Sequence, residues 1–285
     1  MIRFSPFSLN IKGSVWTFSQ PLIMGILNVT PDSFYAGSHT TEESAIRERA
    51  AKMLEEGANI IDIGGYSSRP NADEVPVEEE IRRVVKGIKA VRELSTDILI
   101  SVDTFRSEVA ETAVTEYGAD IINDISGGDL DPNMINVVPR LKVPYIIMHM
   151  RGNPGTMSRL TDYADVTGDV LRELSIKIET FTHAGVNDII IDPGFGFAKT
   201  LEQNYDMLSH LELFQVFELP VLVGISRKSM IYKALDTTPE NALNGTTVIN
   251  TIAMLNGASI LRVHDVKEAV EARKIIQLTY NPANL

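Results

Sequence analysis

The feature that most constrains the fold of this chain is a series of eight short apolar runs, separated by segments with helical patterns. The runs lack strict alternation of apolar and polar residues, which is typical of parallel strands covered on both faces. Each is therefore predicted to be a buried strand. The predicted strands are Leu22–Val29, Ala58–Gly65, Asp97–Thr104, Ala119–Ser126, Val143–Met150, Asn187–Gly194, Pro220–Ser226 and Ala258–His264.

Helical signatures fill the segments between these runs. In "TEESAIRERAAKMLEEG", Thr41 can cap a helix whose apolar residues recur at 3.6 spacing before Gly57. The segments 77–94 and 166–185 have the same pattern. Strand and helix alternate eight times within a chain of 285 residues, which predicts the α/β class and a (β/α)8 TIM barrel.

An open, doubly wound sheet is the alternative architecture, but no GxGxxG phosphate fingerprint follows the first strand. Residues 1–19 alternate around Lys12–Gly13 and are predicted to form a β-hairpin that closes the barrel floor. No linker rich in Ser, Gly or Pro divides the chain. Residues 1–285 are therefore expected to form one domain.

Composition excludes several classes of function. The net charge of −12 argues against a nucleic-acid surface, because phosphate backbones favour broad basic patches. The apolar runs are too short to span a bilayer, and the N-terminus has no continuous apolar signal region. The chain has no cysteine, which excludes disulfides and thiolate chemistry and is compatible with a reducing cytoplasm. We expect a soluble cytoplasmic protein without a membrane or nucleic-acid partner.

Polar side chains lie at or just after the carboxyl ends of the predicted strands, the face on which barrels carry their active sites. Each could be purely structural, since Asp, Asn and Ser are common at loop starts and helix caps. That alternative is strongest for Asp62 and His149. The residues are Asn28, Asp62, Ser68, Arg69, Asp103, Asn123, His149, Asp192, Lys228, Arg262 and His264.

These residues divide into two chemical groups. Carboxylates and amides can bind the paired N–H donors of a flat heterocycle. Arg69, Lys228, Arg262 and a protonated His264 can bind an anion, and three of these four follow the last two strands, where barrels commonly bind phosphate. The sequence therefore predicts a ligand with a heterocyclic and an anionic part. The polar segment 30–40 after the first strand is expected to provide a mobile cover, while Asn28 stays with the rigid strand end.

The chain resembles the dihydropteroate synthase family from about Pro21 to its C-terminus. The resemblance implies condensation of 6-hydroxymethyl-7,8-dihydropterin diphosphate with p-aminobenzoate, with Mg2+ as cofactor, in an enzyme that is usually a homodimer formed by late helices. The matching blocks are "MGILNVTPDSF", "IIDIGGYSSRP", "SVDTFRSEVA", "INDISGG", "IIMHMRGNPGTM", "IIIDPGFGFAKTLEQN", "VGISRKSMI" and "GTTVINTIAMLNGASILRVHDV".

The resemblance also implies roles for individual residues. The family's pterin-binding positions match Asp103, Asn123, Asp192 and Lys228, with Met148 beneath the ring. Positions on the diphosphate side match Ser68, Arg262 and His264, and the magnesium contact matches Asn28. The p-aminobenzoate pocket matches Pro70, Phe197 and Ser226, and Arg69 belongs to the second loop. Expected catalytic residues are Asp103, Lys228, Arg262 and His264.

The chain departs from the family pattern in two loops. Ala36 stands where an aspartate is common, and "YSSRPNA" places Tyr66, Ser68 and Asn71 where "ESTRPGA" is frequent. Two other functions stay open at this point. A corrinoid-linked methyltetrahydrofolate methyltransferase shares the barrel and the pterin-binding acids but needs no diphosphate site, and a catalytically silent pterin-binding protein would tolerate Ala36.

Overall fold

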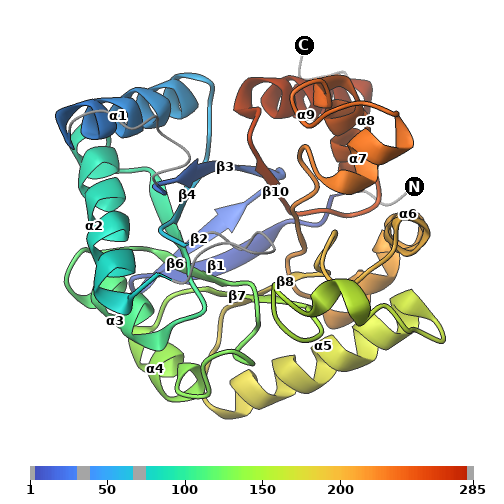
Figure 1. Ribbon diagram of the computed structural model, residues 1–285, viewed down its shortest axis with the longest axis horizontal. Coiled ribbons are helices and arrows are strands. Elements are labelled where there is room, and N and C mark those ends of the chain that lie inside the picture. The colour runs from blue at the N-terminus through green and yellow to red at the C-terminus, as the bar shows by residue number, and fades with distance from the viewer. Residues whose placement is uncertain (1–3, 31–38, 67–74, 281–285) are drawn as a thin grey trace.

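The computed structural model describes residues 4–30, 39–66 and 75–280, with the backbone alone for residues 39–42. Eight parallel strands pair in the order β8-β7-β6-β5-β4-β3-β10-β9, and a parallel bridge between Ile191 and Val221 joins β8 to the segment before β9. The sheet therefore closes on itself (Figure 1). The strands are β3 Leu22–Asn28, β4 Ile60–Gly64, β5 Leu99–Asp103, β6 Ile121–Asp124, β7 Tyr145–Met148, β8 Ile189–Asp192, β9 Leu222–Val223 and β10 Ile260–Val263.

Closure confirms the predicted TIM barrel and excludes the open sheet. Every predicted strand is present, although each is shorter than its apolar run. The shortest, β9, pairs with β10 only through Leu222 and Val223. Polar residues and glycines occupy the carboxyl ends of several runs, where the chain leaves the ladder to form loops.

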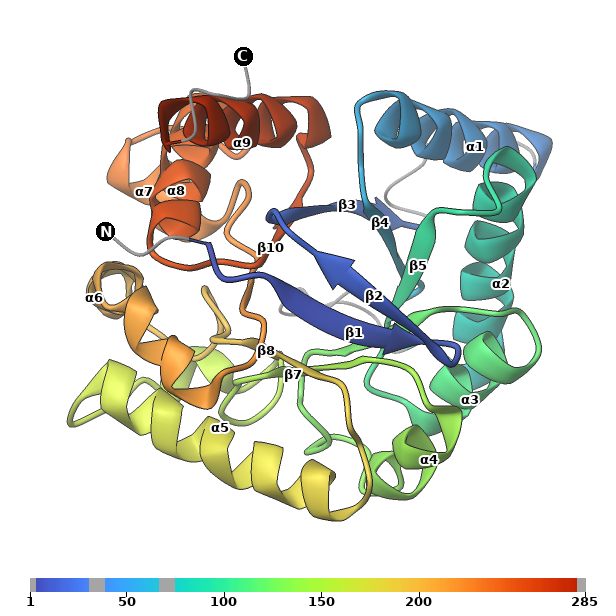
Figure 2. The same ribbon diagram turned by 180° about the vertical axis from the view of Figure 1, so that it is seen from behind.

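Helices surround the barrel (Figures 1 and 2). The segment predicted at 77–94 is helical over those residues, whereas α1 begins at His39, so Thr41 lies within its first turn rather than before it. Among the described residues, no helix has the length and apolar character needed to cross a membrane. The helices are α1 His39–Glu55, α2 Val77–Leu94, α3 Ser107–Thr115, α4 Met134–Leu141, η2 Met157–Arg159, α5 Val166–His183, α6 Leu201–Ser209, η3 Leu211–Phe217, α7 Ser229–Ala234, α8 Leu243–Leu255 and α9 Val266–Tyr280.

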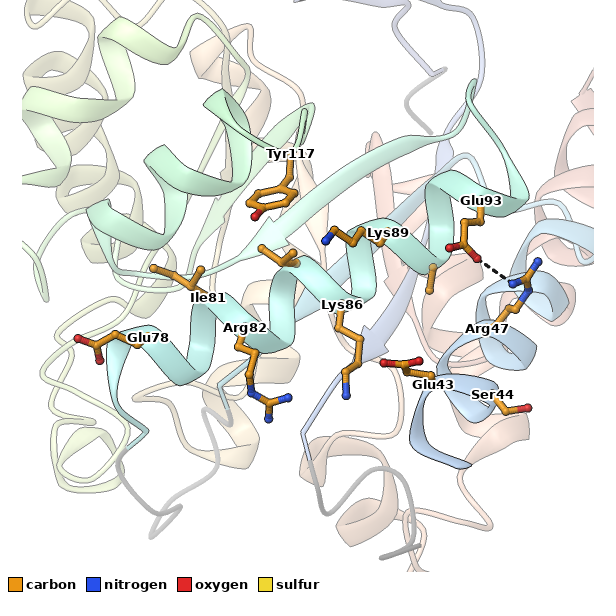
Figure 3. A pocket seen from close by; sticks show the side chains of 12 residues that line it. Glu43, Ser44, Arg47, Glu78, Ile81, Arg82, Lys86, Lys89, Glu93 and Tyr117 are labelled. Atoms are coloured by element: carbon orange, nitrogen blue, oxygen red, sulfur yellow. Dashed lines mark hydrogen bonds and ion pairs between the residues drawn. The ribbon is translucent and has the colours of Figure 1, made fainter. Parts of the chain in front are cut away.

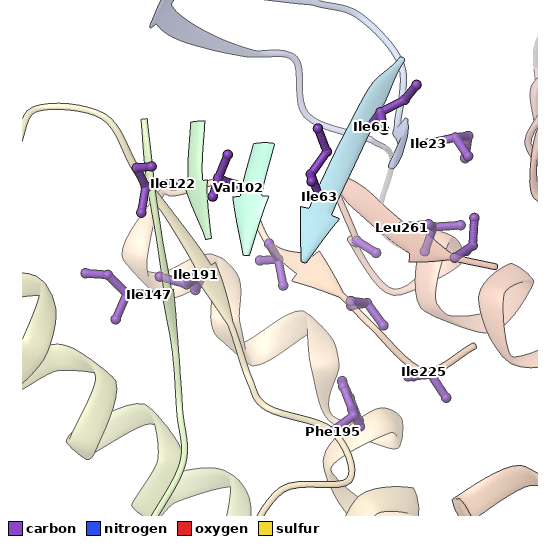
Figure 4. Packing of buried hydrophobic residues seen from close by; sticks show 14 of the residues in the cluster. Ile23, Ile61, Ile63, Val102, Ile122, Ile147, Ile191, Phe195, Ile225 and Leu261 are labelled. Atoms are coloured by element: carbon purple, nitrogen blue, oxygen red, sulfur yellow. The ribbon is translucent and has the colours of Figure 1, made fainter. Parts of the chain in front are cut away.

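Outward-facing strand residues form the main hydrophobic core between barrel and helices. Because side chains alternate across a strand, every second residue packs against the helical ring. Ile23, Ile61, Val102, Ile147 and Leu261 belong to this cluster (Figure 4). Burial of these aliphatic residues fixes the strand positions, and it thereby fixes which residues face the barrel interior.

Inward-facing residues near the strand starts form a second apolar cluster, which fills the floor of the barrel. The hairpin of β1 Phe7–Ile11 and β2 Ser14–Phe18 crosses this end (Figure 2), and Leu9 is buried against the floor. Lys12 and Gly13 have φ values of 52° and 83°, as a two-residue type I′ turn requires. The predicted hairpin and its position are confirmed.

Candidate active site

Five of the strands turn from apolar to polar along their inward faces. Ile60, Leu99 and Ile260 belong to the floor, and the residues two positions after them are Asp62, Ser101 and Arg262. The same step leads from Ile121 to Asn123 and from Ile190 to Asp192. Because side chains alternate between the two faces of a strand, residues two positions apart point the same way. These polar side chains therefore point into the barrel, above the apolar floor.

Arg262 reaches across the barrel to two carboxylates. Its Nε donates to Oδ2 of Asp62 at 2.6 Å, and its Nη2 donates to Oδ2 of Asp103 at 2.5 Å. The guanidinium is largely buried, so solvent screens these ion pairs less than it would on the surface. The expected anion-binding cation and the expected pterin-binding acid are thus direct partners.

Asp62 lies beneath both halves of the predicted site. The Oδ2 atom that accepts from Arg262 also accepts from Nδ2 of Asn123 at 3.1 Å. The side chain of Asp62 is fully buried, and its Oδ1 atom has no hydrogen-bond partner among the described residues. Ser101, its register partner on β5, likewise has a buried Oγ without a partner in the described parts of the chain.

Burial and nearby charges shift the pKa values of Asp103 and Arg262. It raises the pKa of Asp103 to about 7; Arg262 opposes this shift, while the nearby carboxylates of Asp62, Glu80 and Asp124 add to it. Burial lowers the pKa of Arg262, but Asp62 and Asp103 outweigh it, and the net shift is upward. Arg262 is therefore a fixed cation, whereas Asp103 titrates near neutral pH.

Asp192 and Lys228 occupy the opposite side of the barrel end. Burial raises the pKa of Asp192 against the attraction of Lys228, and burial lowers the pKa of Lys228 to about 8 against the attraction of Asp192. Lys228 Nζ donates to the carbonyl of Phe195 at 2.6 Å and lies 4.5 Å from the ring centre of Phe197. Lys228 is therefore held by the loop that follows Asp192.

The sequence interpretation missed a second lysine behind that loop. Lys199 Nζ lies 3.0 Å from the carbonyls of Gly194 and Phe197 and 3.0 Å from Nδ1 of His149. These three acceptors match the three N–H donors of the Lys199 ammonium, so Nδ1 of His149 accepts. The hydrogen of the neutral His149 ring is then on Nε2, which donates to Glu173 at 2.9 Å. Burial lowers the pKa of Lys199 to about 7. In the sequence, Lys199 follows the apolar residues of "GFGFA", and this was the available signal that the lysine is buried.

His149 has a structural environment. It is buried, its backbone N–H donates to the carbonyl of Asp192, and both ring nitrogens have partners. Burial lowers its pKa to about 4. Of the two interpretations, the structure favours a satisfied core histidine.

Ser226 and His264 meet at the ends of adjacent chain segments. Ser226 Oγ accepts from the backbone N–H of His264 at 3.1 Å and lies 3.2 Å from its Nδ1. Burial, together with Arg262, lowers the pKa of His264 to about 4. His264 was a candidate anion donor only if protonated; its imidazole is neutral in the free protein at neutral pH and can take part there as a neutral hydrogen-bonding group.

An apolar cluster borders the polar residues. Met148, Met150 and Met157 pack with Ile125 and Ala198, and Phe197 contacts the same cluster. Met148 is the register partner of Asp192, so the thioether and the carboxylate project from neighbouring strands. This arrangement suits a planar ring that has hydrogen-bonding edges and an apolar face.

The position of Asn28 suits a hard metal ion whose other ligands are mostly water or substrate oxygens. A Cβ added at Gly64 would lie 3.2 Å from Asn28 Oδ1 and 3.8 Å from Asp103 Oδ2, so the glycine keeps space open between these oxygens. Among the described residues, no three Asp, Glu or His side chains form a metal cage. Mg2+ commonly uses few protein ligands together with phosphate and water, so a single amide oxygen fits it.

Several predicted residues lie outside the described parts of the chain: Ser68, Arg69 and Pro70, as well as Ala36 and Asn71 in the departing loops. Tyr66 is described; its ring packs edge-on against Phe105, and Arg106 lies over it. The remaining predicted site residues all come to the carboxyl end of the barrel.

A separate groove lies on the outer surface between α1 and α2 (Figure 3). Its lining includes Lys86, Lys89 and Tyr117, and an ion pair between Arg47 and Glu93 lies at one end. Side chains of both charge signs line it. The groove lies on the outer side of the helices and does not share residues with the strand-end site.

Comparison with known proteins agrees with this geometry. The model of the family described as pterin binding enzyme matches residues 24–264. The dihydropteroate synthase of Escherichia coli K12 is 43% identical over 271 residues, which cover 94% of this chain and 95% of the relative.

Solved structures give the same result. The Xanthomonas albilineans dihydropteroate synthase with 4-aminobenzoic acid superposes with a TM-score of 0.90 at 38% identity, covering 97% of this chain and 99% of the other. Its complex with 7,8-dihydropteroate gives a TM-score of 0.86 at 36% identity, covering 96% and 99%. The chain therefore belongs to the pterin-binding enzyme family and, within it, to the dihydropteroate synthases.

Proposed function

We propose that this transferase joins 6-hydroxymethyl-7,8-dihydropterin diphosphate to p-aminobenzoate mainly by positioning the reactants and stabilising the departing diphosphate. The observation that carries the proposal is the contact of Arg262 with both Asp62 and Asp103. It places a permanent cation directly beside a carboxylate suited to the pterin. Bound 4-aminobenzoic acid and 7,8-dihydropteroate in the Xanthomonas albilineans enzyme support the same chemistry here.

The pterin half of the site consists of Asp103, Asn123 and Asp192. Ionised carboxylates accept the paired N–H donors of the heterocycle, and an amide both donates and accepts. Met148 would lie against the ring face, as its place in the apolar cluster allows. These groups hold and polarise the heterocycle, and neither aspartate acts as a general acid or base.

The diphosphate half consists of Arg262, Lys228 and neutral His264. Negative charge develops on the bridging oxygen as the bond to the exocyclic methylene breaks, and preorganised donors lower the energy of that state. The electron-rich dihydropterin can carry the positive charge left on the methylene. Ser68 would contribute a hydroxyl to this half.

Asn28 would hold Mg2+ through its side-chain oxygen. When bound, this ion supplies positive charge to the diphosphate oxygens. The protein residues do the remaining work: Arg262 and Lys228 meet the anionic charge, while the barrel end limits the access of water.

The aryl amine is proposed to approach from the side of Phe197 and Ser226, with Pro70 completing the pocket. The ring of Phe197 lies close to Lys228, so the amine would arrive beside the breaking bond. The bond between the methylene carbon and the bridging oxygen breaks first, the amine nitrogen then attacks the methylene carbon, and the amine proton is lost to solvent or diphosphate. Orientation contributes a large part of such a rate enhancement.

Product analysis separates this function from the two alternatives. Purified protein is incubated with the pterin diphosphate, radiolabelled p-aminobenzoate and Mg2+, and labelled dihydropteroate is measured. A synthase forms labelled product and diphosphate together. A corrinoid-linked methyltransferase or a silent pterin-binding protein forms none, and either result would reject the proposal.

We also propose that the enzyme is a cytoplasmic homodimer formed through the late helices. Support comes from exposed apolar residues there: Leu235, Val248 and Ile275 are 55%, 51% and 64% exposed. Sedimentation of the wild type and of Val248→Glu tests the dimer. A monomer at all concentrations, or a dimer unaffected by Val248→Glu and Ile275→Glu together, would contradict it.

A further inference from the structure

Asp62 contacts residues from both halves of the proposed site. It lies in the middle of β4 and faces the barrel interior, one layer above the floor. A buried carboxylate is costly unless donors surround it. Its donors are Arg262 and Asn123, which belong to the diphosphate and pterin halves of the proposed site.

Asp62 determines which way the amide of Asn123 faces. An ionised carboxylate accepts hydrogen bonds and cannot donate them, so Nδ2 of Asn123 must lie toward Asp62. The amide oxygen and the second N–H then remain for the ligand. Without this contact, the amide could adopt either of two flipped orientations. In the other orientation its donor and its acceptor would exchange places toward the ligand.

Asp62 also fixes the plane of Arg262. The guanidinium is held at Nε by Asp62 and at Nη2 by Asp103, and two anchors determine the orientation of a planar group. Three of its five N–H groups are not used by these two bonds. These are available to an anion in a defined direction.

The unsatisfied oxygen of Asp62 argues against a purely structural role. Buried polar groups in native proteins usually have partners, and an orphan atom in a barrel core reduces stability. Asp62 Oδ1 and Ser101 Oγ on the next strand are both orphaned within the described residues. Protein contacts therefore leave hydrogen-bonding capacity unused in this layer, which a residue kept only for packing would not explain.

We propose that Asp62 is a positioning residue that sets Asn123 and Arg262 in one rigid frame, so that the heterocycle and the diphosphate of the substrate are held in register. The inference rests on the proposed function. It assigns Asp62 no contact with substrate.

The test compares Asp62→Asn with Ser101→Ala, a control in the same layer that removes no contact between side chains. Asp62→Asn is expected to lower kcat/KM for the pterin diphosphate roughly 10- to 100-fold, since small misplacements of catalytic groups have effects of this size. KM for p-aminobenzoate should change less than about twofold, a small effect beside that loss. Ser101→Ala should retain wild-type kinetics.

Binding measurements identify the route of the effect. The probes are 6-hydroxymethyl-7,8-dihydropterin, which lacks diphosphate, and inorganic diphosphate with Mg2+. Asp62→Asn should weaken both. It should add no further loss of pterin binding to Asn123→Ala, and no further loss of diphosphate binding to Arg262→Ala, because Asp62 acts through these residues.

Additive losses in both double variants would overturn the inference. So would a lowered Tm with kcat/KM for the folded Asp62→Asn enzyme within twofold of wild type. If Asp62→Asn does not fold, Asp62→Glu, which retains but displaces the charge, should show the same kinetic pattern; failure of both to fold shows a structural role and also overturns it. Absence of labelled dihydropteroate with the wild type rejects the proposed function, while the probe-binding cycles still test the positioning.

Discussion

The Nη2 atom of Arg262 lies 2.5 Å from Oδ2 of Asp103, although their strands, β10 and β5, are separated in the barrel by β3 and β4. The contact connects the two halves of the proposed site in the free enzyme. A bound substrate offers N–H donors to Asp103 and an anion to Arg262, so it can supply each residue with a second partner. Cation and acid are thereby positioned before substrate arrives, which reduces reorganisation during catalysis.

Replacement of Arg262 by alanine should remove roughly 2 to 4 kcal/mol of transition-state stabilisation, as for other preorganised electrostatic groups. This corresponds to a loss of about 30- to 1,000-fold in kcat/KM. Arg273→Met is the matched control, because Arg273 is a buried arginine that donates to Pro21 O and Asn59 Oδ1 at the floor. It should lower Tm while preserving kcat/KM. Near-normal turnover by Arg262→Ala would count against the proposed role.

Lys228→Ala should have an effect of similar size, about 2 to 4 kcal/mol, because Lys228 is the second cation at the site. Steady-state assays with varied pterin diphosphate measure it. Lys177→Ala serves as the control, since Lys177 is also largely buried but donates to the carbonyl of Ser126 and pairs with Asp129 outside the proposed site. Equal losses in both variants would show that the effect comes from general destabilisation.

The pH profile of kcat/KM for the pterin diphosphate should be bell-shaped. Asp103 must be ionised to accept N–H donors and has a pKa of about 7, so activity falls as the pH drops below 7. Lys228 must be charged and has a pKa of about 8, so activity falls again above 8. The charged groups acting on Asp103 are Arg262, Asp62, Glu80 and Asp124.

Asp103→Asn provides the control for this profile. It should lower activity and abolish the acid limb, because an amide does not titrate in this range. An unchanged acid limb in Asp103→Asn would assign that limb to another group, such as the substrate diphosphate.

Asn28→Ala should raise the Mg2+ concentration needed for half-maximal retention of diphosphate by roughly tenfold, equivalent to about 1.4 kcal/mol. Equilibrium binding of labelled diphosphate over a magnesium titration measures this without turnover. Asn256→Ala is a suitable control, since Asn256 caps α8 and donates to the carbonyl of Leu208. Coincident titration curves for wild type and Asn28→Ala would argue against the metal contact.

Much of the fold is predictable because it depends on local patterns. The apolar runs identify all eight strands, and the segment 77–94 carries enough periodicity to give α2 its full extent. The turn at Lys12–Gly13 identifies the hairpin. Strand ends are less predictable, because they depend on register with neighbours; Leu222–Val223 is short since only two residues of its run pair with β10.

Within the site, strand order predicts which residues share a face but not which of them touch. The contact of Arg262 with Asp62 joins residues 200 positions apart, across an intervening strand. Lys199 was missed because its buried position depends on the loop that folds over it. The charge of His264 was also unpredictable, since its pKa follows from burial and from Arg262 rather than from residue type.

Positional isotope exchange measures the departure of diphosphate at the preorganised cationic centre without the second substrate. Pterin diphosphate carrying 18O in the bridge between methylene and phosphorus is incubated with enzyme and Mg2+ without p-aminobenzoate, and 31P NMR follows the label. The wild type should move label into non-bridging positions, and Arg262→Ala should do so far more slowly. Label that stays in the bridge, with an enzyme that turns over normally once p-aminobenzoate is added, would contradict the account.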